Sequence, residues 1–385
     1  MKIVYCLNNI CQLGGIENIT AVKANALAKI PGNEVYITVT NNERESLFPL
    51  LPEVKLINLG VDNWNPEWGT SKIRYYSYII RKRILYKRRL KSFLKEVKPD
   101  IVISAGFMEF RFLPSLRKYI GAIISEYHFT RDWLKYCQRK DFLWRIYCFG
   151  NKWSERYVIK RYNQVVVLTR EDMEKNWKGC KNVTVMPNPI SFSENAQSVS
   201  SLENKKIIAA GRLVEQKNFS SLIRAFRRVV DRFPDWKLEI YGDGGEYMLL
   251  NNLIQALQLD NNVRLCGRVS NVQEKMLESS VFVLSSNYEG LPLVLLEAMS
   301  CGLPAVSYDC PCGPKDIITD GVDGFLVSKG DEQMLAEKIC YLIAFPEKRA
   351  KMGAAARKKS EDYRLEKIIP RWIDLFERLI AAKRK

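Results

Sequence analysis

The stretch VFVLSSNYEGLPLVLLEAMSCGLPAVSYD, residues 281–309, decides the fold class. It begins with the apolar, β-branched run of a buried strand, and NYEG then marks a loop at the carboxyl end of that strand. Pro292 suits the first position of a helix, Gly302 ends that helix, and LPAV starts another strand. A strand, a helix and a second strand in this order indicate a parallel β-α-β unit.

The same alternation of strands and helices runs through both halves of the chain. The first half holds the β-branched runs KIVYCL, EVYITVT, VKLINL, DIVISAG, AIISEYH, QVVVLT and NVTVMP, with a helix expected around residues 16–30. The second half holds KKIIAAGRL, WKLEIYGDG and VRLCGRV, with helices expected at 219–233, 246–257 and 272–279. Strands that alternate with helices predict an α/β protein whose parallel sheets carry helices on both faces.

The chain is long enough for more than one hydrophobic core, because it has 385 residues. A Ser-, Asn- and Glu-rich stretch without periodicity, residues 191–204, predicts the linker. We therefore place one Rossmann-like domain at 1–190 and a second at 191–365. The last segment, RLEKIIPRWIDLFERLIAAKRK, predicts a helix bent at Pro370, and we expect residues 366–385 to pack back on the first domain.

Composition excludes several classes of protein. With 47% apolar and 27% charged residues, the chain has the make-up of a globular protein and not of a disordered or fibrous one. We find no signal peptide and no apolar run long enough for a membrane span. The ten cysteines lack the spacing of a disulfide scaffold, so we expect reduced thiols in a cytoplasmic protein. With a single histidine besides, we predict no metal site and no cofactor.

The positive charge is concentrated in the first half of the chain. Residues 1–190 hold 32 of the 60 basic residues but only 17 of the 43 acidic ones. Residues 71–98 alone carry eleven basic residues and one acidic residue, and their apolar residues, such as Tyr86 and Leu90, recur at helical spacing. One interpretation is a core-packed helix with a solvated outer face. We favour attraction to an anionic membrane surface, which this charge density and the interleaved aromatic residues suit; nucleic acid would satisfy the electrostatics as well.

Two glutamates flank the start of the helix in the opening stretch. Glu289 lies in the loop at the carboxyl edge of the sheet, and Glu297 lies about a turn and a half into the helix that follows. Between them, the amides of Leu293 and Val294 lie at a helix N-terminus, which favours an anion such as phosphate. Two glutamates eight residues apart are also common as mere surface acids, so this prediction depends on the loop-to-helix context.

A second set of candidates ends the first strand of the second half. In AAGRLVEQKNF, Arg212 follows the strand and Lys217 stands five residues later, before a helix. Arginine offers bidentate contacts to phosphate oxygens and lysine a compact charge, so this pair suits a diphosphate without a divalent ion. The only nearby acid in the sequence is Glu215, and two ordinary surface cations are the alternative interpretation.

The first half contributes two further candidate sites. Gly14 and Gly15 follow the first strand, where backbone can approach a phosphate or a sugar, although G-x-G-x-x-G is not completed and a dinucleotide cofactor is not indicated. His128 ends another strand, and Glu126, two residues earlier, projects to the same side. A lone histidine is often structural, but at a carboxyl edge it can bind a sugar hydroxyl or share a proton.

These motifs together resemble a known enzyme family. GRLVEQKN, YGDG, VRLCGRV, the NYEGLPLVLLEAMSCGLPAV block and CPCGPKDIITDGVDGFLV, in that order, resemble the family 4 retaining glycosyltransferases of GT-B fold. The resemblance is dense over about residues 205–330, and GG-x-E at 14–17 with MPNPI at 186–190 extends it into the first half. It implies a donor site in the second domain, an acceptor site in the first, and an interdomain cleft that both parallel sheets face.

The resemblance also implies roles for individual residues. Arg212 and Lys217 would hold the donor diphosphate, Glu289 would lie against the donor hexose, and Glu297 would accept hydrogen bonds from the ribose. The backbone amides of Gly290, Leu291, Leu293 and Val294 would donate hydrogen bonds to the sugar and the phosphates of the nucleotide sugar. Arg268 and Val269 would lie beside the base, and Gly15 would approach the diphosphate from the first domain. Relatives with an S-E-H run have histidine where this chain has Tyr127. Because a one-residue shift reverses the face of a strand, Glu126 or Tyr127 is an alternative to His128.

The function expected from this resemblance is transfer of a hexose or N-acetylhexosamine, with retention, to a hydroxyl of a lipid-linked saccharide in surface polysaccharide or lipopolysaccharide biosynthesis. CPCGPKDII is similar to a run in relatives that use UDP-linked sugars, so UDP is the expected nucleotide. We expect a cytoplasmic enzyme peripheral to the membrane, without metal and without a nucleic-acid partner. A nucleotide-sugar 2-epimerase and a non-enzymatic nucleic-acid-binding protein are the alternatives.

Overall fold

The computed structural model describes residues 1–11, 14–40, 46–61, 72–106, 108–131, 154–191 and 198–384. The chain forms two compact units. The first consists of Met1–Leu168, Met173–Pro189 and Ile368–Lys385, and the second consists of Thr169–Asp172 and Ile190–Lys367. The polypeptide thus passes to the second unit next to the expected boundary at 190/191, and it returns to the first unit for its last residues.

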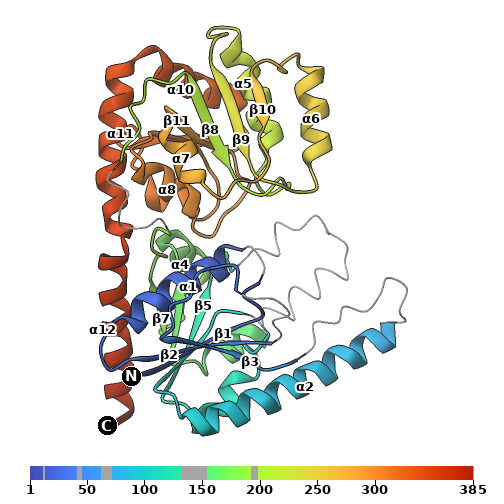
Figure 1. The fold of residues 1–385 in the computed structure, drawn as a ribbon, viewed down its shortest axis with the longest axis vertical. Helices are drawn as coiled ribbons and strands as arrows, with labels where there is room; N and C mark the ends of the chain where they lie inside the picture. Colours follow the sequence, from blue (N-terminus) through green and yellow to red (C-terminus); the bar gives the residue numbers. More distant parts are fainter. Residues whose placement is uncertain are drawn as a thin grey trace. The chain divides into compact units, whose positions relative to one another are not determined.

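A seven-stranded parallel sheet forms the centre of the first unit, in the order β3-β2-β1-β4-β5-β6-β7 (Figure 1). The strands are β1 (Lys2–Leu7), β2 (Glu34–Val39), β3 (Val54–Asn58), β4 (Ile101–Ser104), β5 (Ala122–Tyr127), β6 (Gln164–Val167) and β7 (Val183–Val185). The central strands are buried along most of their length, because helices cover both faces of the sheet. This explains why their sequences are continuous apolar runs.

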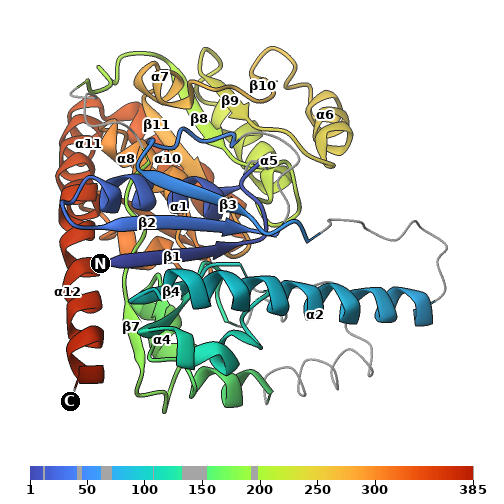
Figure 2. The ribbon, with the colours of Figure 1, turned by 60° about the horizontal axis from the view of Figure 1, so that its bottom comes forward.

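The helices of the first unit pack on opposite faces of its sheet. They are α1 (Gly15–Ala28), α2 (Lys72–Val97), the 3-10 helix η1 (Leu113–Tyr119), α4 (Arg170–Asn176) and most of α12 (Leu365–Arg384). Figures 1 and 2 show α1 and α2 on the two sides of the sheet. Tyr86 and Leu90 of α2 are fully buried against Val4 and Cys6 of β1, as their helical spacing predicts.

The second unit has a six-stranded parallel sheet in the order β10-β9-β8-β11-β12-β13. Its strands are β8 (Lys206–Ala210), β9 (Lys237–Tyr241), β10 (Val263–Leu265), β11 (Val281–Leu284), β12 (Ala305–Asp309) and β13 (Gly324–Ser328). Its helices are α5 (Phe219–Val230), α6 (Tyr247–Ala256), α7 (Val272–Leu277), α8 (Leu293–Ser300), α9 (Pro314–Ile317), α10 (Glu332–Ala344) and α11 (Pro346–Ser360). The predicted α/β class with two parallel sheets is confirmed.

Both sheets reverse their strand order at one point, between β1 and β4 in the first unit and between β8 and β11 in the second. In open parallel sheets, ligands bind beyond the carboxyl ends of the strands at such a point, since neighbouring loops diverge there and leave a crevice. The loops that follow β8 and β11 hold most of the candidate residues. The fold therefore identifies the edge of each sheet at which a site is expected.

Some boundaries differ from the sequence predictions. Pro292 is the N-cap of α8 and not its first residue, and α5 and α7 end two or three residues earlier than expected. The pair α10 and α11 was not predicted, although both are regular helices; α11 begins at Pro346 directly after the end of α10. The last helix, α12, continues through Pro370. The sequence also predicts a helical stretch up to about residue 160, and most of it lies outside the described residues.

Arg349 of α11 is a buried cation that joins three separate carbonyl groups. Its Nη1 donates to the carbonyls of Leu342 and Ile343 at the end of α10, at 2.8 and 3.3 Å, and its Nη2 donates to the carbonyl of Leu202 at 2.8 Å. The guanidinium also lies 5.5 Å from the centre of the Trp236 ring. It satisfies the unpaired carbonyls of a helix C-terminus with a full positive charge.

We expect Arg349→Met to lower the free energy of unfolding of the second unit by about 3 kcal/mol, since it leaves three buried carbonyls without their donor. Lys351→Met, at an exposed position of the same helix, is the control. We expect it to change the free energy of unfolding by less than about 0.5 kcal/mol. Urea unfolding followed by tryptophan fluorescence measures both. Equal stability of the two variants would show that the guanidinium contributes nothing to the fold.

Candidate functional site

The loops after β8 and β11 are joined into one structure by backbone and side-chain bonds. The amide of Asn287 donates to the carbonyl of Gln216 at 2.7 Å, and its Nδ2 donates to the carbonyl of Glu215 at 2.8 Å. In return, Nε2 of Gln216 donates to the carbonyl of Tyr288 at 3.0 Å. These reciprocal bonds fix the relative position of the two loops, and with it the charged residues that they carry.

Lys217 and Glu289 form an ion pair across these loops. Nζ of Lys217 lies 2.6 Å from Oε1 of Glu289, and both side chains are largely buried. Oγ of Ser286 donates to the same carboxylate oxygen at 2.6 Å. The expectation that Lys217 has no acidic neighbour except Glu215 is therefore wrong. Because β8 and β11 are adjacent, the parallel sheet brings together two loops that are far apart in the sequence.

Arg212 also lies at this edge. Its side chain is exposed, and within the described ranges no carboxylate lies within ion-pair distance of it. It follows β8 directly, as predicted. A guanidinium without a carboxylate partner, beside a paired lysine, can accept an anionic ligand without first breaking an internal salt bridge.

The start of α8 leaves backbone donors at the same edge. The amides of Leu295 and Leu296 donate to the carbonyl of Pro292, at 3.0 and 3.4 Å, so the amides of Leu293 and Val294 precede the first hydrogen bonds of the helix. Gly290 and Leu291 connect this helix to Glu289. The loop after β12 packs against the same turn: at Gly313, where φ is 110°, an added Cβ would lie 2.4 Å from Cδ of Pro292. Only glycine permits this approach.

Glu297 lies on α8, as predicted, but its neighbour was not predicted. Oγ of Ser191 donates a short hydrogen bond to the Glu297 carboxylate. Burial raises the pKa of this carboxyl above its ordinary value, although the Ser191 hydroxyl opposes the shift. The other predicted neighbours of the nucleotide, Arg268 and Val269, lie in the loop after β10, and the bond from the Gly242 amide to the carbonyl of Gly267 attaches this loop to the one after β9.

In the first unit, Gly15 begins α1 directly beyond the loop that follows β1. A Cβ added at Gly15 would meet no described atom within 4 Å, so packing within the chain does not explain the glycine. At Gly14, by contrast, an added Cβ would lie 2.1 Å from Oε2 of Glu17.

Glu126 and His128 lie together at the carboxyl end of β5, as the sequence predicts. Nε2 of His128 is 3.0 Å from Oε2 of Glu126, and both side chains are buried. Tyr127 projects to the opposite face of the sheet, where it packs against Trp177, and its hydroxyl donates to Glu155. The alternative in which Tyr127 takes the place of His128 is therefore wrong, because successive strand residues face opposite sides.

Lys23 of α1 completes this cluster and was missed by the sequence analysis. Its Nζ donates to both carboxylate oxygens of Glu126, at 2.8 and 2.7 Å, and it has no exposed surface. Burial alone would raise the pKa of Glu126, but the Lys23 charge and the His128 contact hold it at about 2. The available signal was the helical spacing, since Lys23 falls on the apolar face of α1 with Thr20 and Leu27.

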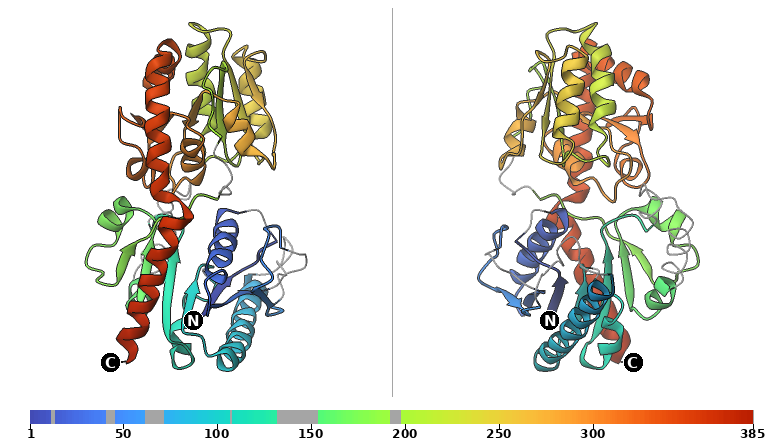
Figure 3. Two further views of the ribbon diagram at one scale, coloured as in Figure 1. Left: turned by 60° about the vertical axis from the view of Figure 1, so that its left-hand side comes forward. Right: turned by 90° about the vertical axis from the view of Figure 1, so that its right-hand side faces the viewer.

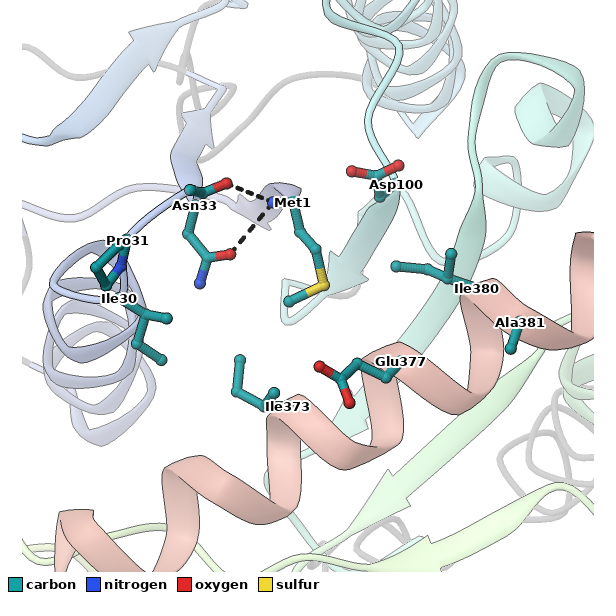
Figure 4. Close-up of a pocket in the computed structure, with 10 residues that line it drawn as sticks. Met1, Ile30, Pro31, Asn33, Asp100, Ile373, Glu377, Ile380 and Ala381 are labelled. Atoms are coloured by element: carbon teal, nitrogen blue, oxygen red, sulfur yellow. Dashed lines mark hydrogen bonds between the residues drawn. The ribbon is translucent and has the colours of Figure 1, made fainter.

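A pocket of about 770 Å³ lies elsewhere, at the amino edge of the first sheet (Figure 4). Met1, Asn33, Asp100 and Glu377 line it together with apolar residues of α12. Ligands of parallel sheets bind at the carboxyl edge, so this pocket is not the candidate site.

Across the described residues, no group of three or more His, Cys, Asp or Glu could hold a metal ion. Nor does any described helix combine the length and apolar composition that crossing a bilayer requires.

Comparisons with known proteins agree with this geometry. Residues 191–359 match the family model for glycosyl transferases group 1. The chain is 31% identical to the amylovoran biosynthesis glycosyltransferase AmsD of Erwinia amylovora, over 97% of this chain and 99% of AmsD. It is 28% identical to a Campylobacter jejuni enzyme named GalNAc-alpha-(1->4)-GalNAc-alpha-(1->3)-diNAcBac-PP-undecaprenol alpha-1,4-N-acetyl-D-galactosaminyltransferase, over 97% of this chain and 98% of that enzyme.

Among solved structures, the chain is similar to a mutant of S. aureus TarM in complex with fondaparinux, alpha-GlcNAc-glycerol and UDP. The TM-score is 0.75 at 18% identity, and the match covers 98% of this chain and 100% of TarM. This similarity supports the fold, which is the GT-B arrangement of two Rossmann-like units. The full-length relationship to AmsD and the family match over the second unit together show that the chain belongs to the group 1 glycosyltransferases.

Proposed function

We propose that the protein is a retaining glycosyltransferase of family 4 that transfers a hexose or N-acetylhexosamine from UDP to a hydroxyl of a lipid-linked saccharide. The observation that carries this proposal is the edge between β8 and β11, where Arg212 follows β8, Lys217 pairs with Glu289, and the amides of Leu293 and Val294 begin α8. The names of the relatives support the chemical class, since TarM was solved with UDP and the C. jejuni enzyme acts on an undecaprenyl-diphosphate saccharide.

In this proposal, each residue of the second unit contacts one part of the donor. Arg212, Lys217 and the amides of Leu293 and Val294 bind the diphosphate, which needs several fixed donors because it is highly charged. Glu289 accepts hydrogen bonds from hydroxyls of the donor sugar, and Glu297 accepts them from the ribose. The amides of Gly290 and Leu291 complete the donor site. In addition, Arg268 and Val269 lie beside the base, and Gly15 lies beside the diphosphate.

The transfer breaks the bond between the anomeric carbon and the diphosphate oxygen and forms a bond from that carbon to the acceptor oxygen. The acceptor proton passes to the departing phosphate oxygen on the same face of the sugar, so the configuration is retained without a covalent enzyme intermediate. Lys217 and Arg212 stabilise the negative charge that develops on the leaving diphosphate, the role that a divalent ion has in other transferases. His128 and Glu126 orient the acceptor hydroxyl.

A panel of UDP-hexoses and UDP-N-acetylhexosamines, each incubated with and without a bacterial membrane lipid extract, tests the reaction. We expect one UDP-sugar to release UDP in an extract-dependent manner and to label a lipid-linked saccharide with retained anomeric configuration. Conversion of a UDP-sugar into its 2-epimer without extract would instead identify a nucleotide-sugar 2-epimerase. Sequence-selective DNA or RNA binding, without any turnover, would favour a nucleic-acid-binding protein.

The outer part of α2 supports a membrane-bound acceptor. Figure 2 shows its N-terminal half extending beyond the other labelled helices and strands of the first unit. Ile80 and Ile84, one turn apart, are 58% and 63% exposed, and Ile79 and Leu85 beside them are partly exposed. A cluster of basic residues surrounds them, namely Arg81, Lys82, Arg83, Lys87 and Arg88. Apolar side chains among basic ones are typical of a helix that lies in an anionic membrane surface. We therefore propose that the enzyme is cytoplasmic and peripheral to the membrane.

Replacing both exposed isoleucines, as Ile80→Ser/Ile84→Ser, is expected to lower partitioning onto phosphatidylglycerol vesicles about tenfold, since two apolar side chains no longer enter the bilayer. The matched control is Met248→Ser/Leu249→Ser, an exposed apolar pair on α6 of the second unit. Vesicle sedimentation at low and at physiological salt measures both. If the two double variants partition equally, or if binding depends neither on vesicle charge nor on salt, α2 is not part of the proposed membrane interface.

A further inference from the structure

The buried cluster around Lys23 offers an inference that rests on the proposed role of His128 in the acceptor site. The side of the first sheet that α1 covers contains an ammonium and a carboxylate in direct contact, and both are buried. A buried ion pair contributes little net stability, because the cost of removing two charges from water offsets their attraction. The pair therefore calls for an explanation other than stability.

The geometry around Glu126 supplies one. Lys23 donates to both carboxylate oxygens, and Oε2 also faces Nε2 of His128 at 3.0 Å. The angle at this contact is not that of a hydrogen bond, so the argument is electrostatic. A nitrogen lone pair 3.0 Å from an anionic oxygen would be repelled, whereas an N–H at that position is attracted, so the charge on Glu126 favours a proton on Nε2. In the neutral ring, the second nitrogen, Nδ1, is then the hydrogen-bond acceptor. The charge of Lys23 thus determines, through Glu126, which nitrogen of His128 can accept a proton or a hydrogen bond.

The C-terminal helix holds Lys23 in this position. The ring of Trp372 on α12 lies with its centre 4.8 Å from Nζ of Lys23, and the Tyr5 ring of β1 lies at 5.8 Å. Aromatic faces attract a cation without neutralising it, so the full charge of the ammonium acts on Glu126. Figure 3 shows α12, coloured red, running alongside the first unit. The groups that face Glu126 are thus Lys23 of α1, His128 after β5 and the Tyr5 hydroxyl of β1, which Glu126 influences electrostatically.

We propose that Lys23 is a positioning residue of the acceptor site, which holds Glu126 as an anion and thereby fixes the Nε2-protonated form of His128. Lys23 itself contacts no substrate. Its function is to set the hydrogen-bonding state of the one imidazole in the protein, and Trp372 keeps it in place for that purpose.

Two variants separate positioning from folding. Lys23→Met leaves a buried carboxylate without its cation and is expected to lower the melting temperature as well as activity. Lys23→Met/Glu126→Gln replaces the pair by neutral groups of similar size, so it is expected to recover most of the melting temperature. If positioning is the function, this double variant releases UDP at least about tenfold more slowly than the wild type when the lipid extract is present, and the decrease is in kcat. Recovery of activity together with stability would show that the pair is structural only.

The single histidine permits a direct observation of the proposed state. Long-range nitrogen-proton NMR spectra, recorded at about pH 8.5 where an imidazole is ordinarily neutral, report which ring nitrogen carries the proton. We expect the Nε2-protonated form alone in the wild type and a mixture of both forms in Lys23→Met/Glu126→Gln. The same single form in both proteins would overturn the inference.

His128→Asn distinguishes this inference from the proposed function. If His128→Asn retains full UDP release, His128 is not in the acceptor site and that part of the proposed function is wrong. If His128→Asn loses activity while Lys23→Met/Glu126→Gln keeps it, only the inference about Lys23 is wrong. UDP affinity is expected to be unchanged in all of these variants, because none of the replaced residues belongs to the proposed donor site.

Discussion

Lys217→Met is expected to lower kcat by about two to three orders of magnitude, which is the usual cost of removing one preorganised donor to a developing negative charge. Its Nζ is positioned by Glu289 at the carboxyl end of β8, and because an ammonium has three protons it can donate to a diphosphate while it keeps this pair. A neutral side chain of similar length keeps the packing but removes the charge that stabilises the leaving group. We expect UDP affinity to fall as well, by about tenfold or more.

Lys205→Met is the control for this change. Lys205 lies in the same unit and pairs with Asp235, but it is exposed at the start of β8, the opposite edge of the sheet. Its loss is expected to leave kcat and UDP affinity unchanged, because an exposed pair contributes little. If Lys217→Met retained wild-type kcat with normal UDP binding, Lys217 would not hold the diphosphate, and the β8–β11 edge would lose its proposed function.

Glu289→Ala is expected to lower kcat/KM about a hundredfold or more, since the donor sugar loses a charged hydrogen-bond acceptor and Lys217 loses its partner. The type of loss distinguishes two mechanisms. A glutamate that only orients the sugar leaves nothing for an added nucleophile to replace. We therefore expect that azide does not restore turnover of Glu289→Ala and that no glycosyl azide forms.

Glu278→Gln, an exposed glutamate at the end of α7, serves as the control and is expected to behave as the wild type. Mass spectrometry of the wild type mixed with a UDP-sugar completes the comparison, since a glycosyl-enzyme intermediate would add the mass of one sugar. A sugar adduct on Glu289, or a glycosyl azide from the alanine variant, would replace the proposed same-face transfer with a double displacement.

The sequence was sufficient for the succession of strands up to β12, because parallel sheets covered on both faces leave continuous β-branched runs between amphipathic stretches. It did not predict β13, α10 or α11. The carboxyl-edge positions of Arg212, Lys217 and Glu289 followed from the same pattern, since each lies in a loop that follows a predicted strand. The ion pair between Lys217 and Glu289 did not follow. It depends on β8 and β11 being neighbours, and strand order is not encoded in any local stretch.

The first unit illustrates the same limit. The two-residue spacing of Glu126 and His128 correctly predicted a shared face, but Lys23 is more than one hundred residues away in the sequence. A lysine on the apolar face of a helix was a visible anomaly, whereas its carboxylate partner depends on how α1 crosses the sheet. Ser191 was likewise beyond prediction, because it belongs to a stretch that read only as a linker.

The central claim is that the edge between β8 and β11 binds a nucleotide diphosphate by fixed cations and backbone amides. A crystal structure of the protein with UDP, grown in the presence of a metal chelator, tests this most directly. We expect the diphosphate within hydrogen-bond distance of Arg212, Lys217 and the amides at the start of α8, and the ribose at Glu297. UDP bound elsewhere, or a requirement for a divalent ion, would contradict the claim.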